Sequence, residues 1–271
     1  MVIEDNINSR GIKRIVKALT DRPSDLDVVV IQVVGRLEHL KAKVAQYNKP
    51  YALVQSSVRS TMNPNTKDWI DIWRGAVCVW SFYDLPALCR DDGVEPDFNF
   101  YHAPLGVDDI FQPSDQKQLY EVCTSGTYLT ESVRECIKAT KGRVAHLGQE
   151  VNLPNVDYYT GLSDQELTEL YAKCKYVSGL RRTEGFELPA AEALCCGVRP
   201  ILFDRPHYRQ WYDGLGWFIA EDSRENVIES LQELFSSEYV PITADDIKEA
   251  KKRFNWDKII EGFYESIRLH M

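Results

Sequence analysis

The sequence predicts an α/β protein made of two successive domains, each built on a parallel β-sheet. Short apolar runs alternate with longer amphipathic stretches, which is the pattern of βα units. The alternation stops at residues 101–108, where Pro104 and Gly106 punctuate the chain, and then starts again. A length of 271 residues accommodates two small domains. We therefore expect two Rossmann-like domains whose parallel sheets face a central cleft.

The first series of elements lies before residue 101. Its expected helices are residues 11–19, 37–47, 68–73 and 85–90. The first of them has apolar residues at i, i+3, i+4 and i+7 from Ile12, which is one face of a helix. Its expected strands are residues 2–3, 27–34, 50–55 and 76–81. The run at 27–34 is too apolar for an exposed strand and suits a buried parallel one. Residues 56–67 are expected to form a loop.

The second series follows the segment at 101–108. Its expected strands are residues 120–123, 144–147, 176–180 and 199–203. Its expected helices are residues 128–140, 165–174 and 189–196, and the rest of the chain is mainly helical, ending with residues 254–269. The aromatic and basic residues at 207–212 either stack against a ligand or, as we favour, belong to a packed helix.

Composition restricts the function classes. A net charge of −9 disfavours nucleic acid as a partner, because such a chain is not steered towards phosphate backbones. No run approaches the roughly 18 apolar residues of a membrane span. The start Met1–Asp5 has no basic n-region followed by an apolar h-region, so we do not expect it to be a signal peptide. Seven cysteines without metal spacing indicate buried reduced thiols. We expect a cytoplasmic protein with no metal and no resident cofactor.

The segment 181–197, RRTEGFELPAAEALCCG, carries the most chemical information. It follows an expected strand, turns and opens a helix, with Pro189 suited to the first turn and Gly197 to the left-handed position after the last. The N–H groups at such a helix start attract anions. Glu192, one turn into the helix, could accept hydrogen bonds from a ribose diol, and Glu184 could face the same pocket. An equally simple interpretation makes both glutamates solvated charges.

This segment resembles the E-x7-E signature of family-4 retaining glycosyltransferases, which have the GT-B fold. Four further segments resemble that family in the same order, at residues 103–113, 157–167, 197–201 and 254–257. The resemblance covers about the last 170 residues, and the first 100 match only in pattern. It implies an acceptor-side domain at 1–108, a nucleotide-sugar domain at 109–255 and a terminal helix at 256–271 that crosses back to the first domain.

The resemblance also implies roles for individual residues. Glu192 would bind the donor ribose, and Glu184 would contact hydroxyls of the transferred sugar. Tyr159 lies in the segment that holds the nucleobase in the family. The backbone N–H groups that would face the sugar and the diphosphate are those of Gly185, Phe186, Glu187 and Leu188. No metal is needed when cationic side chains and helix starts neutralise the leaving diphosphate.

The chain departs from the family pattern at two places that matter for the diphosphate. Glu187 stands where the family usually has glycine. The family's basic pair in GR-x4-KG is missing, and the corresponding junction offers Ser125, Gly126 and Thr127 instead. Arg182 is the best remaining cation, because arginine matches phosphate geometry, and we assign it a catalytic role beside Glu184. Arg181 and Arg134 are weaker candidates, and the ordinary interpretation of all three is a surface charge.

The acceptor side has fewer signals. The family often has a histidine in its first domain, but the run 27–34 here continues as Gly35-Arg36, and His39 lies on an expected helix, so we assign no catalytic base. Small and basic residues of loops that would face the cleft are weak acceptor candidates, against the simpler interpretation of ordinary loops; they are Ser9, Arg10, Ser57, Arg59 and Thr61.

The sequence thus predicts a retaining glycosyltransferase that takes a hexose or pentose from a UDP- or GDP-linked donor. The chain is shorter than most of the family and resembles its compact phage and viral members. One alternative is a phage-type enzyme that glycosylates hydroxymethylated bases in DNA, which the acidic charge disfavours. Another is a degenerate module that binds nucleotide-sugar without turnover.

Overall fold

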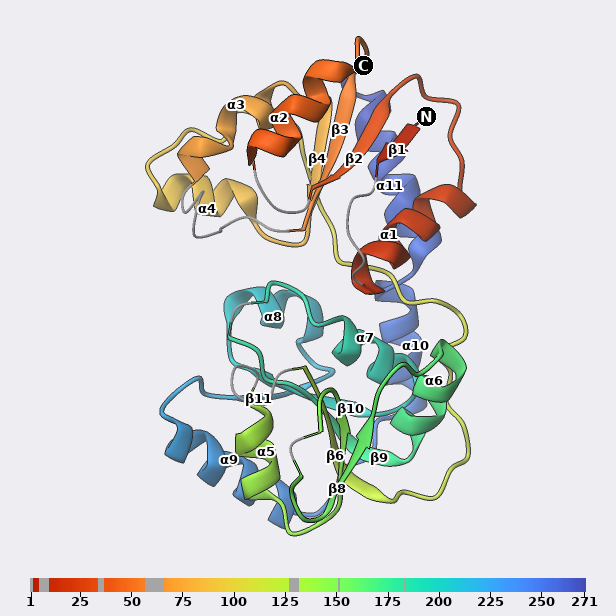
Figure 1. Cartoon of the computed structure of the whole chain (residues 1–271), viewed down its shortest axis with the longest axis vertical. Coiled ribbons are helices and arrows are strands. Elements are labelled where there is room, and N and C mark those ends of the chain that lie inside the picture. The colour runs from red at the N-terminus through yellow and green to blue at the C-terminus, as the bar shows by residue number, and fades with distance from the viewer. Residues whose placement is uncertain are drawn as a thin grey trace. The chain divides into compact units, whose positions relative to one another are not determined.

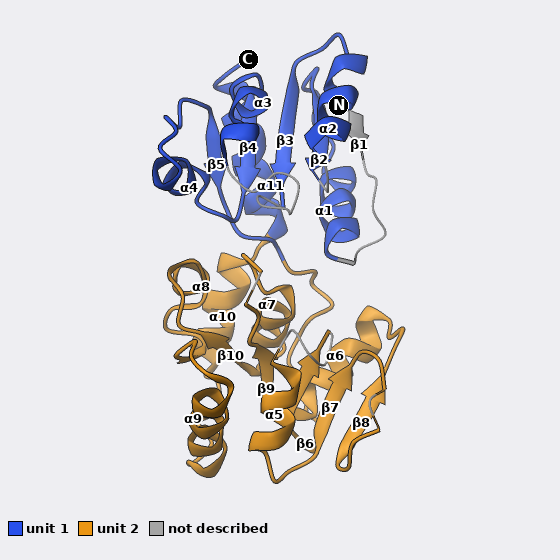
Figure 2. Cartoon of the chain, turned by 60° about the vertical axis from the view of Figure 1, so that its left-hand side comes forward, with its two compact units in different colours: residues 1–106, 256–271 blue, residues 107–255 orange. Residues whose placement is uncertain are grey.

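The computed structural model describes residues 2–4, 10–33, 37–56, 66–126, 132–150, 152–182 and 184–271, of which 2–4 and 10 are described by their backbone alone. The chain divides into two compact units (Figure 2). Unit 1 contains residues 1–106 and 256–271, and unit 2 contains residues 107–255. The C-terminal segment from residue 256 is thus part of unit 1.

Unit 1 is a parallel sheet with helices on both faces (Figure 1). Its strands follow chain order: β1 (Val2–Glu4), β2 (Val29–Val33), β3 (Tyr51–Gln55), β4 (Cys78–Ser81) and β5 (Phe100–His102). One face packs on α2 (Leu37–Gln46), α3 (Ile70–Arg74) and α4 (Leu85–Asp91), with the 3-10 turn η1 (Thr66–Asp68) beside them. Successive side chains of β4 point to opposite faces of the sheet. Val79 packs on the face covered by these helices, and Trp80 packs on the other face.

The second face of unit 1 is covered by α11 (Trp256–Arg268), which also contacts α1 (Arg10–Asp21). The buried residues of α11 recur at helical spacing and form one apolar face: Trp256, Ile259, Ile260, Phe263, Tyr264 and Ile267. The Phe263 ring lies 5.4 Å from that of Trp80. Gly106 allows the start of α11 to approach, since a Cβ on it would lie 2.3 Å from Cδ2 of Trp256.

Unit 2 is a parallel sheet of six strands in the order β11-β10-β9-β6-β7-β8. The strands are β6 (Tyr120–Ser125), β7 (Val144–Leu147), β8 (Val156–Tyr159), β9 (Cys174–Gly179), β10 (Arg199–Phe203) and β11 (Trp217–Ile219). The helices are α5 (Val133–Ala139), α6 (Asp164–Ala172), α7 (Leu188–Cys195), α8 (Pro206–Tyr212), α9 (Arg224–Ser236) and α10 (Ala244–Arg253). Residues 207–212 therefore lie in a helix, with Tyr208, Trp211 and Tyr212 buried.

Both sheets are wholly parallel, which confirms the predicted α/β fold class. Three strands that the sequence does not reveal, β5, β8 and β11, are edge strands of three or four residues. The helix expected at 165–174 ends at Ala172, because Cys174 already pairs as the first residue of β9. The helix expected at 68–73 is divided into η1 and α3. The N-terminal part of the helix expected at 128–140 falls outside the described residues.

Candidate functional site

The strand order of unit 2 reverses between β6 and β9. The chain passes from β6 to β7 and β8 on one side, and from β9 to β10 and β11 on the other, while β6 and β9 are paired in parallel. In open α/β sheets, ligands bind outside the carboxyl ends of the strands at this switch point. Here those carboxyl ends are Ser125 and Gly179. The predicted donor segment begins two residues after Gly179.

The segment 181–197 forms the strand–turn–helix unit that its sequence predicts. Helix α7 runs from Leu188 to Cys195, with Pro189 in its first turn. The chain leaves the helix at Gly197 with φ +82°, a left-handed value that glycine adopts without strain. Because α7 follows the carboxyl end of β9 through a short turn, its start lies at the carboxyl edge of the sheet.

Glu187, which precedes α7, is the most buried charged residue of this turn. Its side chain is 1% exposed and its Oε2 lies 3.0 Å from Nε of Arg181. The Tyr208 hydroxyl lies 3.4 Å from its Oε1, and the Tyr212 hydroxyl donates to its carbonyl at 2.7 Å. Gly179 leaves room for it, since a Cβ there would lie 3.3 Å from Cγ of Glu187. A buried carboxylate is stable only with such partners.

Arg181 connects the two strands of the switch point. Its Nη2 donates to Oγ of Ser125 at 2.9 Å, while its Nε faces Glu187. Ser125 ends β6, and Gly126 follows with φ +96°. The guanidinium is thus held between the ends of β6 and β9. Thr127, also predicted for the donor site, lies outside the described residues.

Arg182, assigned a catalytic role from the sequence, points to a different group of residues. Its Nη1 donates to Glu221 at 3.0 Å and its Nη2 to the carbonyl of Asp222 at 3.2 Å. Its guanidinium lies 4.9 Å from the centre of the Phe203 ring. Arg205 contacts the same Glu221 carboxylate and, with Arg182, lowers the pKa of Glu221.

The two glutamates of the predicted pair have contrasting surroundings. Glu184 is exposed, and its carbonyl lies 3.2 Å from the Tyr208 hydroxyl. Glu192 is 3% exposed, and its Oε2 accepts a hydrogen bond from Tyr171 of α6 at 3.3 Å. Burial, with the nearby Glu192 charge, raises the pKa of Tyr171 well above its usual value. The Tyr171 phenol therefore stays protonated and donates to Glu192.

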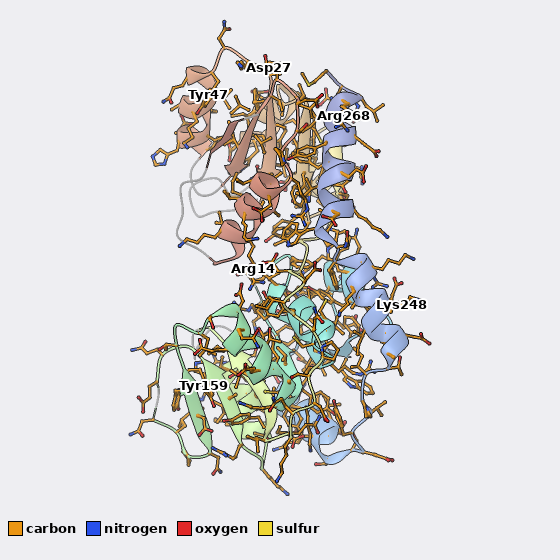
Figure 3. The ribbon with its side chains drawn as sticks, turned by 90° about the vertical axis from the view of Figure 1, so that its right-hand side faces the viewer. Arg14, Asp27, Tyr47, Tyr159, Lys248 and Arg268 are labelled. Carbon is orange, nitrogen blue, oxygen red and sulfur yellow. The ribbon has the colours of Figure 1, made fainter. Side chains whose placement is uncertain are left out.

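The remaining predicted donor residues lie around this turn or on β8. Gly185 and Phe186 are buried, and Leu188 is half-buried. Phe186 packs in an aromatic cluster, its ring 5.6 Å from Tyr212 and 5.8 Å from Phe254. Tyr159 ends the edge strand β8 (Figure 3). Its hydroxyl lies 2.6 Å from that of Tyr120.

His146 on β7 belongs to the same edge and is not singled out by the sequence. It is fully buried, and its Nδ1 lies 2.9 Å from Oγ1 of Thr124. Among the described residues, its Nε2 has no hydrogen-bond partner. A Cβ on Gly148 would lie 2.6 Å from this Nε2 and 2.6 Å from the carbonyl oxygen of Gly126. Burial lowers the pKa of His146, so the ring is neutral at pH 7. A lone histidine in an apolar strand gives no sequence signal.

The acceptor-side candidates fall almost entirely outside the described residues; these are Ser9, Ser57, Arg59 and Thr61. Arg10 begins α1, with its backbone alone described. At the carboxyl edge of the unit 1 sheet, the buried Gln32 donates from Nε2 to Oγ of Ser56 at 2.8 Å.

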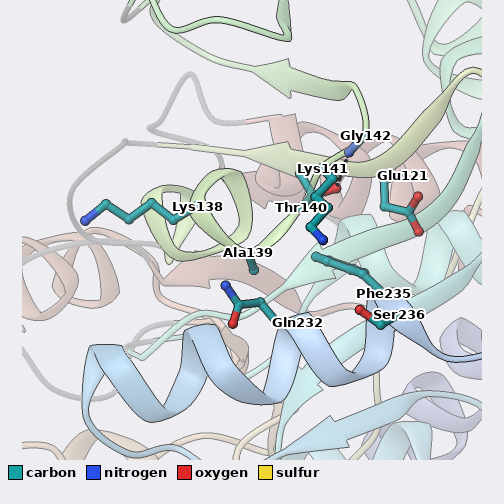
Figure 4. A pocket seen from close by; sticks show the side chains of 9 residues that line it. All are labelled: Glu121, Lys138, Ala139, Thr140, Lys141, Gly142, Gln232, Phe235 and Ser236. Atoms are coloured by element: carbon teal, nitrogen blue, oxygen red, sulfur yellow. Dashed lines mark hydrogen bonds between the residues drawn. The ribbon is translucent and has the colours of Figure 1, made fainter.

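A cavity of about 410 Å³ lies at the opposite, amino edge of the unit 2 sheet (Figure 4). Its lining comes from the start of β6, the end of α5 and the end of α9: Glu121, Lys138, Ala139, Thr140, Lys141, Gly142, Gln232, Phe235 and Ser236. Nearby, Lys175 of β9 donates to Glu121 at 3.1 Å. This cavity is separate from the switch point.

The described residues contain no group of three or more histidine, cysteine or acidic side chains able to hold a metal ion. All seven cysteines are buried, and none forms a disulfide bond. In the described part of the chain, no helix is both long and apolar enough to cross a membrane.

Comparison with curated proteins gives two partial likenesses, and no protein-family model matches the chain. A protein of Sulfolobus islandicus filamentous virus named glycosyltransferase 41 is 43% identical over 60 residues, which are 22% of this chain and 18% of that protein. An uncharacterized glycosyltransferase of Methanocaldococcus jannaschii is 28% identical over 115 residues, which are 41% of this chain and 32% of that protein. The chain thus matches less than half of either relative's length.

Solved structures resemble the chain over most of its length. A sucrose-phosphate synthase from Thermosynechococcus elongatus superposes with a TM-score of 0.72 at 11% identity, covering 90% of this chain and 73% of that one. Anabaena HepE in complex with UDP-glucose gives a TM-score of 0.72 at 12% identity, covering 95% and 82%. At such identities the likeness concerns the fold. The chain has the α/β fold of the GT-B glycosyltransferases, with two parallel sheets.

Proposed function

We propose that the protein is a glycosyltransferase that takes a sugar from a UDP- or GDP-linked donor and transfers it with retention of configuration. The observation that carries this proposal is the position of the segment 181–197 at the β6–β9 switch point of a GT-B fold. The names of both partial relatives support it, as does the complex of HepE with UDP-glucose.

In this proposal the donor lies along the carboxyl edge of the unit 2 sheet. Glu192 accepts from the ribose diol, and Glu184, which is exposed, contacts the transferred sugar. Backbone N–H groups at 185–188 face the sugar and the diphosphate, while Ser125 and Gly126 border the diphosphate. Tyr159 lies beside the base. Positioning of the reacting groups and stabilisation of the leaving diphosphate supply most of the catalysis.

Transfer then proceeds on one face of the sugar. The bond between the anomeric carbon and the phosphate oxygen breaks, and the acceptor oxygen bonds to the same face of that carbon. The acceptor proton passes to the leaving phosphate oxygen, so the enzyme needs no separate base. In this proposal, arginine and backbone N–H groups meet the charge of the leaving diphosphate.

A screen of UDP- and GDP-sugars tests this function. One donor should raise the melting temperature, because a ligand of the native state stabilises it, and should be slowly hydrolysed in excess EDTA. The NMR coupling constant at the new anomeric centre should match that of the donor. An inverted centre would contradict retention, and loss of turnover in EDTA would contradict metal independence. Binding without any turnover would favour a degenerate module, and binding of no donor would overturn the proposal.

A further inference from the structure

We propose that Arg181, held in place by the buried carboxylate of Glu187, is the cation that contacts the leaving diphosphate of the donor, and that Arg182 does not. This inference rests on the proposed function and names the residue that neutralises its leaving group. Two contacts of the Arg181 guanidinium carry it: a hydrogen bond to Ser125 at 2.9 Å and an ion pair with Glu187 at 3.0 Å.

The position of the Arg181 guanidinium matches the place where a ligand is expected. Ser125 ends β6, and Arg181 lies two residues beyond the end of β9. These strands flank the switch point, and the start of α7 faces the same edge. Ligand phosphates bind at this edge in open α/β sheets. The free N–H groups at the start of a helix there attract the negative charge of the phosphate. The Arg181 side chain keeps 16% exposure, so a ligand at the edge can reach it.

The surroundings of Arg182 are those of a structural residue. Its contacts to Glu221, Asp222 and Phe203 come from β10 and from the segment between β11 and α9. Of the two arginines, the one whose guanidinium donates to Ser125 is therefore not Arg182. The structure places Arg181 there.

Stability alone is a weak reason to bury the Arg181–Glu187 pair. Desolvation of a buried ion pair offsets much of its attraction, and apolar residues of similar size often do as well. The pair has a clearer role as a positioning device, because Glu187 and Ser125 together hold the guanidinium, a group whose planar shape suits phosphate oxygens. Glu187 is also where the resembled family has glycine, and in this proposal the N–H groups of the Arg181 guanidinium take the place of the missing basic pair.

His146 adds a second observation at the same edge. Its Nε2 is buried and has no hydrogen-bond partner among the described residues, and it lies near Gly148 and the carbonyl of Gly126. A buried polar nitrogen without a partner is costly, which is consistent with an edge whose hydrogen bonding is completed by a ligand.

The test compares binding of UDP and GDP with binding of uridine and guanosine, by calorimetry on the full chain. The double variant Arg181→Gln/Glu187→Gln removes both charges together and leaves no uncompensated buried carboxylate. It should bind the preferred diphosphate about 10- to 100-fold more weakly, the range for charge-assisted hydrogen bonds, with nucleoside affinity unchanged within about twofold. Arg182→Gln should change diphosphate affinity by less than about threefold.

The matched control is Glu121→Gln/Lys175→Gln, which removes an ion pair at the opposite edge of the same sheet and should leave both affinities unchanged. If the double variant does not fold, as judged by circular dichroism, Arg181→Lys replaces it. This variant keeps the charge beside Glu187 and loses the planar fork, so diphosphate affinity alone should fall.

Unchanged diphosphate affinity in the Arg181 variants would overturn the inference. So would an equal loss for diphosphate and nucleoside, which indicates general damage, or a larger loss in Arg182→Gln. These outcomes leave the proposed function standing, because the wild-type chain still binds a nucleoside diphosphate. A wild-type chain that binds neither UDP nor GDP would contradict the proposed function as well.

Discussion

At the scale of single residues, the two glutamates of the E-x7-E pattern have different physical properties. Glu184 is exposed to solvent, whereas Glu192 is 3% exposed and accepts a hydrogen bond from Tyr171. A carboxylate held in this way is rigid and weakly hydrated. In the proposed ribose site, such a carboxylate would discriminate strongly between a ligand that supplies hydroxyl donors and one that lacks them.

We expect Glu192→Gln to weaken discrimination for the ribose while leaving the fold intact, because glutamine has nearly the same shape. The wild type should bind UDP or GDP about tenfold more tightly than the 2′-deoxy nucleotide, the value of a charged hydrogen bond, and the variant should not. Calorimetry measures both affinities. Glu169→Gln, at an exposed position on α6, is the control. Equal discrimination in wild type and Glu192→Gln would remove Glu192 from the ribose site.

At the scale of elements, α11 completes the core of unit 1. It is the last helix of the chain, yet its apolar face packs on β4 and β5. Phe263 is fully buried against Trp80 and lies 6.2 Å from the Tyr101 ring. Truncating the chain before residue 256 would therefore expose one face of the unit 1 sheet.

We expect Phe263→Ala to lower the free energy of unfolding by about 3–5 kcal/mol, because it leaves a cavity between α11 and the sheet. Leu269→Ala should change it by less than about 0.5 kcal/mol, since Leu269 is 80% exposed. Urea titration followed by tryptophan fluorescence measures both changes, because Trp80 and Trp256 of this core are among the six tryptophans of the chain. Similar midpoints for both variants would show that α11 does not contribute to this core.

At the scale of the whole molecule, one buried and two half-buried histidines link stability to pH. Burial lowers the pKa values of His102 in unit 1 and of His146 and His207 in unit 2. The unfolded chain then binds more protons than the native chain below its histidine pKa of about 6.5. Each histidine can therefore reduce stability by up to about 1.4 kcal/mol per pH unit as the pH falls from 6.5 towards 5.

The urea midpoint should consequently be lower at pH 5 than at pH 7. A further fall is expected below about pH 4, where carboxylates with lowered pKa values, such as Asp204 and Glu221, take up protons. His146→Asn should flatten the slope between pH 7 and 5, whatever its effect on stability at pH 7. A midpoint that is constant from pH 7 to 5 would show that these histidines titrate normally in the native state.

The sequence by itself determined the features that depend on neighbours along the chain. Alternation of apolar runs and amphipathic stretches predicted the two parallel α/β series. Local signals at Pro189 and Gly197 predicted the turn and the limits of α7, and spacing predicted the helical form of the last segment. The short edge strands β5, β8 and β11 were missed, because three or four residues carry too little pattern.

Only the tertiary structure decided which side chains meet at the switch point. Ser125 and Arg181 are 56 residues apart, and they become neighbours because β6 pairs with β9. The pairing of β6 with β7 places His146 beside Thr124, and Glu187 is buried among Arg181, Tyr208 and Tyr212. Which of Arg181 and Arg182 faces the edge depends on how the chain leaves β9. Such contacts join distant segments, and their geometry arises from packing of the whole sheet, which no local pattern encodes.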